Sequence, residues 1–141
     1  MKKYPLLYIA FGLMIILGAL HFLAITFYFY WTLWWFDNLM HLLAGFSGGL
    51  ITVWFLFDSD LFFKRSPTTF ESFLYVIIAV LIVGVAWEIF EYVNKITGTE
   101  SVEEYISDTI HDLMADALGA ISASFVWTKR SIDWIRGKQT Q

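Results

Sequence analysis

Four long stretches of the chain are almost entirely apolar, and polar residues gather between them. The stretches cover residues 6–29, 38–57, 70–93 and 106–127. Each is close to the roughly 20 residues that an α-helix needs to cross about 30 Å of hydrocarbon. Transmembrane β-strands would give alternating segments of about ten residues instead. The pattern therefore predicts an all-α protein, a bundle of four transmembrane helices that forms a single integral membrane domain over residues 1–141.

The fourth stretch is the least hydrophobic because its first half carries ionisable residues. From Leu113 to Trp127 the only charged residue is Asp116, and the small side chains around it suit close helix packing in a membrane. We therefore predict a fourth crossing here.

The first stretch is longer than the apolar core of a signal peptide, and no small-x-small cleavage pattern follows it. We expect it to be retained as the first helix.

The Lys and Arg residues are distributed unevenly between the two sides that four crossings would create. Eight fall on the side of the two termini and the 58–69 loop, and one, Lys95, falls on the other side. Such a bias marks the cytoplasmic side. The sequence therefore predicts a multi-pass protein of the cell (inner) membrane with both termini in the cytoplasm. The aromatic cluster at residues 27–36 would then anchor the helices at the outer interface.

Composition agrees with a membrane protein and narrows the chemistry. Hydrophobic residues make up 58% of the chain and charged residues only 16%, against about 25% charged residues in soluble domains. A disordered chain and a nucleic-acid-binding module are therefore not expected. The sequence contains no cysteine, which excludes disulfides and thiolate metal sites.

Eight ionisable residues in or beside the second, third and fourth predicted spans lie three or four positions apart, so that each of these helices presents one polar edge. They are Asp37, His41, Glu88, Glu91, Asp108, His111, Asp112 and Asp116. If successive helices of the bundle run in opposite directions, three of their ends lie at one level. These are the start of the second helix, the end of the third and the start of the fourth. Ionisable residues inside a membrane are costly and suggest function by default. We therefore predict a carboxylate–histidine site in the outer half of the bilayer.

Charge balance points to a bound cation. Six of these residues are acids, and no Lys or Arg lies within a predicted span to offset them. Six unpaired carboxylates cannot all remain ionised in a medium of low dielectric constant. Carboxylate and imidazole ligands without cysteine suit Zn²⁺, Mn²⁺, Fe²⁺ or Mg²⁺. We therefore predict a divalent metal ion as cofactor, with all eight residues as candidate ligands; protonation of some acids, or access of water, is the alternative.

Simpler roles are open to several polar and small residues. Asp37 could cap the second helix, and His21 is expected to act as a hydrogen-bonding partner. For Glu88, Asp112 and Asp116 the alternative is hydrogen bonding between helices. Five of the glycines within the spans are expected to be packing positions for close helix contact; they are Gly45, Gly48, Gly49, Gly84 and Gly119.

The polar segments resemble a known family pattern. They are Phe36-Asp37-x-x-x-His41 with Gly45, Trp87-Glu88-x-x-Glu91-Tyr92, and Asp108-Thr109-Ile110-x-Asp112-Leu113 with Gly119-Ala120. Over residues 37–120 the chain is similar to the YjdF-type family, a group of small and largely uncharacterised inner-membrane proteins of bacteria and archaea. A fainter similarity connects it to VanZ-like proteins, which are associated with glycopeptide-antibiotic resistance.

The resemblance implicates particular residues in the site. These residues are Asp37, His41, Glu88, Glu91, Asp108 and Asp112. His111 and Asp116 are candidates through their spacing alone. Because the family has no secure activity, the resemblance strengthens the prediction of a site without defining what that site does.

Three classes of function agree with these patterns, and the sequence leaves open whether the protein is an enzyme. The first is a metal-dependent membrane hydrolase that acts on a lipid or lipid-linked substrate from the outer leaflet. The second is a transporter or carrier of divalent cations or protons, because acid and histidine chains serve such transport. The third is an accessory subunit of a membrane complex. Membrane lipids are the expected partners, a homo-oligomer remains open, and no nucleic-acid partner is expected.

Overall fold

The computed structural model describes residues 5–59, 61, 68–96 and 101–139, with side chains described up to Ile132. Every regular element in this part of the chain is helical, which confirms the all-α prediction. The elements are α1 (Pro5–Phe27), α2 (Phe29–Thr32), α3 (Phe36–Val53), the π-helical η1 (Trp54–Asp58), α4 (Thr69–Asn94) and α5 (Val102–Gln139).

Local sequence signals account for several helix ends. Thr68 caps α4, because its hydroxyl accepts a hydrogen bond from the Glu71 backbone N–H while the Glu71 carboxylate accepts one from the Thr68 N–H. The Ser101 hydroxyl accepts a hydrogen bond from the backbone N–H of Glu104 in the first turn of α5. The capping role considered for Asp37 is wrong: α3 begins at Phe36 after Trp35, so Asp37 already lies inside the first turn.

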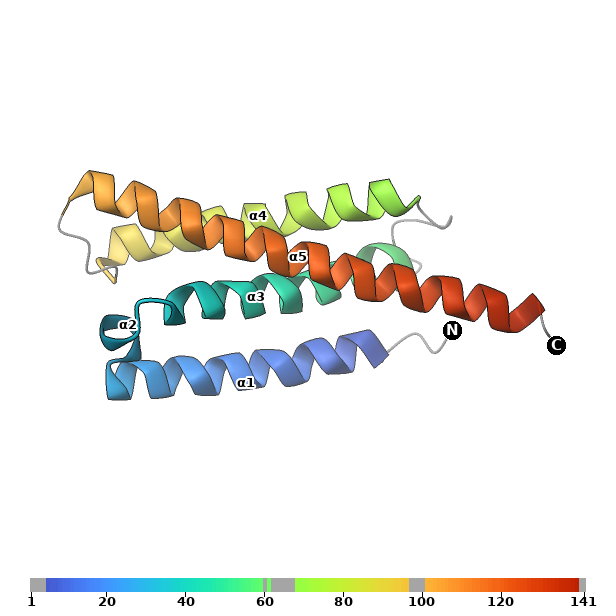
Figure 1. The fold of residues 1–141 in the computed structure, drawn as a ribbon, viewed down its shortest axis with the longest axis horizontal. Coiled ribbons are helices and arrows are strands. Elements are labelled where there is room, and N and C mark those ends of the chain that lie inside the picture. Colours follow the sequence, from blue (N-terminus) through green and yellow to red (C-terminus); the bar gives the residue numbers. More distant parts are fainter. Residues whose placement is uncertain (1–4, 60, 62–67, 97–100, 140–141) are drawn as a thin grey trace.

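The four long helices run along one axis in alternating directions, with α3 in the middle (Figure 1). α3 packs against α1, α4 and α5, and α5 also packs against α4. The start of α1 and the end of α5 lie at one end of the bundle, while α2 and the start of α5 lie at the other (Figure 1). The expected polar edges on α3, α4 and α5 are therefore brought to the same end.

Three of the helical stretches are long and apolar enough to cross a membrane. They are Pro5–Phe27, Phe36–Asp58 and Thr69–Asn94, with 23, 23 and 26 residues. Their outward surfaces are rich in exposed apolar side chains, as lipid-facing surfaces are; on α4, for example, Ile82 and Val83 are 65% and 69% exposed. The fourth crossing predicted at residues 106–127 lies within the 38-residue α5, and it stays a prediction.

Glycines bring α3 and α5 unusually close together. A Cβ atom added to Gly45 would overlap the Asp116 backbone, and one added to Gly119 would overlap the carbonyl oxygen of Leu42. Such contacts are the means by which small residues let membrane helices approach. The expected packing role is confirmed at Gly45, Gly49, Gly84 and Gly119. Gly48 differs, because the nearest atom to its added Cβ would be 3.8 Å away.

Candidate metal centre

His41 is the central residue of the polar cluster. It lies in the second turn of α3 and is only 7% exposed. Its Nδ1 atom lies 3.4 Å from Asp116 Oδ2 on α5. Its Nε2 atom lies 3.9 Å from Asp37 Oδ1 and 3.8 Å from Glu88 Oε1 on α4. One imidazole ring therefore faces acids from three helices.

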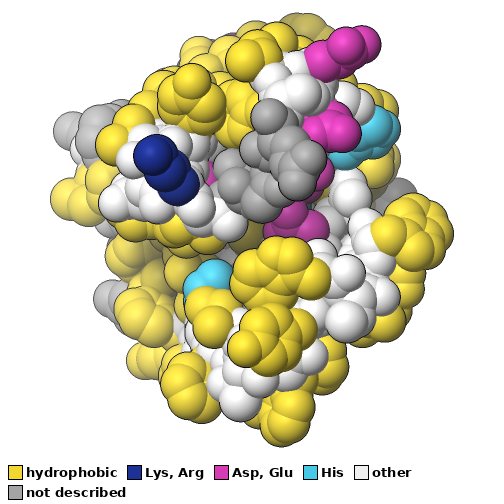
Figure 2. Space-filling model, turned by 90° about the vertical axis from the view of Figure 1, so that its left-hand side faces the viewer, with side chains coloured by type: hydrophobic (Ala, Val, Ile, Leu, Met, Phe, Trp, Pro, Cys, Tyr) yellow, Lys and Arg dark blue, Asp and Glu magenta, His cyan; other side chains and the backbone are white. Residues whose placement is uncertain are grey.

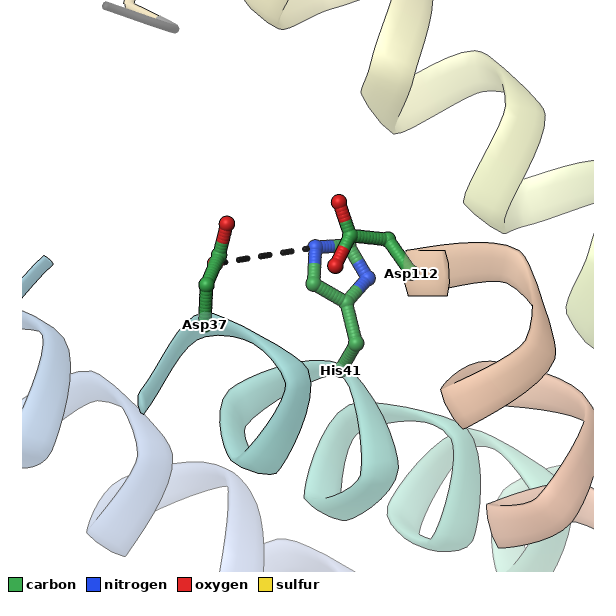
Figure 3. A group of neighbouring side chains, drawn as sticks. All are labelled: Asp37, His41 and Asp112. Atoms are coloured by element: carbon green, nitrogen blue, oxygen red, sulfur yellow. Dashed lines mark ion pairs between the residues drawn. The ribbon is translucent and has the colours of Figure 1, made fainter. Parts of the chain in front are cut away.

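Asp37, His41 and Asp112 form the tightest group of potential metal ligands. Each offers one ligand atom, and these atoms all lie within 4.8 Å of one another. In Figure 3 the carboxylate of Asp112, from α5, lies beside the His41 ring, and Asp37 reaches toward it from one turn earlier in α3. Ligands at about 2.1 Å from one ion are at most about 4.2 Å apart. Small side-chain rotations would therefore bring all three ligand atoms onto one ion.

Glu88 enters the cluster from α4 and is held there by α5. The hydroxyl of Thr109 donates a 2.7 Å hydrogen bond to Glu88 Oε2, and the hydroxyl of Tyr105 donates one of 3.0 Å to the Glu88 carbonyl oxygen. The other carboxylate oxygen, Oε1, is buried without a hydrogen-bond partner among the described residues, and so is Oδ1 of Asp112. Buried polar atoms without a hydrogen-bond partner are costly, and a cation, a proton or a water molecule would stabilise these two oxygens.

The cluster contains far more acidic than basic side chains. The ranges 36–58, 69–94 and 101–128 contain no Lys or Arg. Figure 2 shows the corresponding end of the molecule, where acidic and histidine side chains gather among hydrophobic ones and basic side chains are sparse. Of the two imidazoles in these ranges, that of His41 lies among the carboxylates, whereas that of His111 is exposed.

The structure brings together five of the eight candidates, namely Asp37, His41, Glu88, Asp112 and Asp116. Glu91 is partly buried one turn beyond Glu88 and lines an adjacent cavity. Asp108 is partly exposed, one turn before Asp112. His111 is exposed, and its Nδ1 atom lies 2.7 Å from the Ser107 carbonyl oxygen of its own helix. His111 is thus not part of the cluster.

His21 has the hydrogen-bonding role that was expected of it. Its Nδ1 atom and the hydroxyl of Tyr30 are hydrogen-bonded at 2.7 Å. Burial, together with the nearby carboxylates of Asp37 and Glu91, raises the pKa of the Tyr30 phenol to about 12. Tyr30 therefore remains a neutral phenol next to the acidic cluster.

Three residues that support the site were missed by the sequence analysis. Thr109 and Tyr105 position Glu88, and Tyr30 was treated only as part of an interfacial anchor. Thr109 lies three positions before Asp112, and Tyr105 lies four positions before Thr109. Helical spacing places both on the face of α5 that carries Asp112, and this signal could have found them.

A cavity of about 570 Å³ opens beside the cluster. Its lining comes mainly from α1, α3 and α4 and is largely apolar, with polar groups concentrated where Asp37, His41, Glu91 and Asp116 reach it. This size lies within the range of about 300–1,000 Å³ that is usual for small-molecule sites. The carboxylate–histidine cluster is therefore accessible from a mostly apolar cavity.

Comparison with known proteins places the chain in a family. The sequence model of the family described as "Predicted membrane protein (DUF2238)" matches residues 1–132. The match is consistent with the YjdF-type resemblance, whereas no match supports the similarity to VanZ-like proteins. No curated protein and no solved structure matches the chain. Because the match extends over nearly all of the sequence, the chain belongs to this family of predicted membrane proteins.

Proposed function

We propose that the cluster binds one divalent metal ion, and that the protein is a metal-dependent hydrolase of a membrane lipid or lipid-linked substrate. The observation that carries the proposal is the pair of buried carboxylate oxygens, on Glu88 and Asp112, that have no hydrogen-bond partner among the described residues. Both belong to the cluster around His41. A cation placed among these groups would supply the missing partner for both oxygens.

The geometry suggests a role for each residue. His41 Nε2, Asp37 and Asp112 are the proposed ligands, and Glu88 Oε1, 3.8 Å from Nε2, is the fourth. Asp116 contacts the other ring nitrogen, which is the usual position of the carboxylate that orients a metal-binding histidine. Such a mixed oxygen and nitrogen set suits Zn²⁺, Mn²⁺ or Fe²⁺, and Mg²⁺ remains an alternative.

Hydrolysis is favoured because a water-accessible acid lies beside the cluster. When bound, such an ion supplies Lewis-acid chemistry, since it acidifies water and polarises an ester or phosphoryl oxygen. Glu91 is partly buried at the cavity, where its carboxylate is positioned to accept a proton as a general base. An apolar cavity next to these groups suits a lipid-borne substrate.

A carrier of divalent cations or protons is the second candidate, favoured by the contact between His41 and two acids on opposite sides of its ring. Against it, the cavity beyond the cluster is lined by apolar residues such as Ile51, Ala79 and Val80. These offer no ligands for an ion on the way across. The third class of function, an accessory subunit of a membrane complex, would leave the buried acids unexplained.

The proposed location is the inner membrane, with cytoplasmic termini and the cluster in the outer half of the bilayer. The distribution of Lys and Arg supports this orientation. The start of α1 and the end of α5 lie together at the bundle end opposite the cluster (Figure 1), which agrees with an even number of crossings.

Metal content tests the proposal directly. Protein purified without added metal should carry about one divalent ion per folded chain, and Glu88→Ala and Asp112→Ala should lose it. Glu103→Ala, which alters an exposed acid in the first turn of α5, should keep it. Full occupancy in all three variants, or no metal in the parent under any condition, would refute the site. Metal-dependent release of products from phospholipid vesicles, compared with ion flux into liposomes, separates the hydrolase from the carrier.

A further inference from the structure

The cavity beside the cluster forms a groove between α1 and α4, over α3. α3 forms its floor, while α1 and α4 form its walls. α1 packs against α3 and α2, and it makes no substantial contact with α4 in the described part of the chain. α1, α3 with η1, and α4 are the three stretches with the length and hydropathy of membrane spans. The groove therefore opens sideways, toward the medium in which acyl chains lie.

The groove matches an acyl chain in polarity and length. Its walls and floor include Met14, Leu17, Ala44, Ile51, Val80 and Val83. On α3 its lining residues extend from Asp37 to Thr52, which is about 22 Å at the helical rise of about 1.5 Å per residue. One leaflet contributes about 15 Å of hydrocarbon, so the groove is long enough for a complete acyl chain.

The polar end of the groove has the chemistry of a site for an ammonium group. Asp37 and Glu91 line it together with the aromatic rings of Tyr30 and Trp87. Carboxylates attract a cation by charge, and the faces of aromatic rings attract ammonium groups. The carboxylates of Asp37, Glu91 and Asp116 line the cavity, and the cluster beside it adds those of Glu88 and Asp112. This excess of acidic groups would disfavour an anionic head group.

We propose that this groove binds one acyl chain of a bilayer lipid whose head group carries an ammonium, with that head group beside Glu91. The proposal rests on the proposed function, because it names the substrate class of the same site. The lipid enters sideways between α1 and α4. Its head group stops at the level of the carboxylate–histidine cluster, and its acyl chain extends along α3.

Blocking the groove tests whether it binds an acyl chain. Gly48 lines the groove, and an added Cβ there would have no neighbour closer than Val80 at 3.8 Å, so Gly48→Leu would place its side chain in the groove. In nanodiscs, phosphatidylethanolamine with a photoactivatable acyl chain should label α3 and α4 in the parent. Labelling should fall about tenfold in Gly48→Leu, as expected for a weakened binding site. Gly12→Leu is the matched control, because nothing lies within 4 Å of its added Cβ.

A second variant tests the same groove in case Gly48→Leu does not fold. Val83 lines the groove and is 69% exposed, so Val83→Trp narrows the groove from its open edge without entering the packed core. It should reduce labelling as Gly48→Leu does. If both variants are labelled as strongly as Gly12→Leu, the groove does not bind the acyl chain.

A comparison of lipid head groups tests whether the site recognises an ammonium group. Phosphatidylethanolamine should label the parent about tenfold more than phosphatidylglycerol with the same acyl chain. Glu91→Gln should remove most of that preference, because it removes one carboxylate beside the head group. Equal labelling of the parent by the two lipids would overturn the ammonium assignment.

Metal analysis of the same samples distinguishes the two proposals. Gly48→Leu and Val83→Trp should retain the parent's metal content, because neither residue belongs to the proposed ligand set. A parent that binds metal but shows no groove-dependent labelling would refute the lipid groove alone. A parent without metal that is still labelled in the groove would refute the metal centre alone.

Discussion

The close crossing of α3 and α5 places Asp112 and Asp116 against His41. Adding a single methyl group at Gly119 tests whether this crossing determines the geometry of the site. A Cβ added there would lie 2.5 Å from the Phe46 backbone nitrogen and 2.8 Å from the Gly45 carbonyl carbon, and it would overlap the Leu42 oxygen. Ordinary contact begins at 3.4 Å. In Gly119→Ala, α5 must therefore move away from α3 by more than the difference between 3.4 Å and 2.5 Å, about 0.9 Å, because the Leu42 oxygen is closer still.

That displacement would weaken both the fold and the site. Strain from an added methyl group in a packed interior costs about 1–3 kcal/mol. His41 Nδ1 and Asp116 Oδ2 are already 3.4 Å apart, so a further shift would break their contact. Loss of a carboxylate that orients a metal-binding histidine reduces metal affinity by about 10–100-fold. Asp112 lies one turn before Asp116 and would move with it.

Thermal unfolding in detergent and a metal titration measure the two effects, with Gly12→Ala as the control. Nothing lies within 4 Å of a Cβ added at Gly12, and replacing glycine by alanine inside a helix stabilises it by up to about 1 kcal/mol. The same substitution should thus lower the melting temperature at Gly119 and leave it unchanged or raise it at Gly12. Equal melting temperatures and equal metal affinities in the two variants would refute this account of the crossing.

Three further predictions concern the cation, the support of Glu88 and the topology. A strong chelator should lower the melting temperature of the parent, since a ligand at 100 times its Kd stabilises by about 2.7 kcal/mol; an unchanged melting curve would instead favour protonated acids. Thr109→Val removes the donor to Glu88 Oε2 and should destabilise the protein by about 1–3 kcal/mol, whereas Thr26→Val, on an exposed part of α1, should change stability little. A reporter fused after Gln141 should be active only in its cytoplasmic form; alkaline-phosphatase activity there would contradict the orientation.

Hydropathy alone was sufficient for the helical architecture, because burial in hydrocarbon requires long apolar helices whatever their neighbours are. The predicted stretches 6–29, 38–57 and 70–93 coincide with α1, α3 with η1, and α4 to within two residues at each end. Alternating helix directions also predicted that the polar edges meet at one end of the bundle, and His41 of α3 indeed lies close to Glu88 of α4 and Asp116 of α5. Hydropathy did not define the first residue of α3, so the capping role considered for Asp37 was wrong. The exact start of this helix depends on the turn that precedes it.

Only the tertiary structure decided which polar residues are in contact. Periodicity placed His111 beside the acidic stripe of α5, but the packing of α5 on α3 turns Asp112 and Asp116 toward His41 and leaves His111 exposed. The contact between Thr109 and Glu88 also depends on how two helices pack. The spacing of residues defines the faces of one helix, whereas contacts between helices depend on how closely their backbones approach. Here glycines on both α3 and α5 set that distance, so neither helix determines it alone.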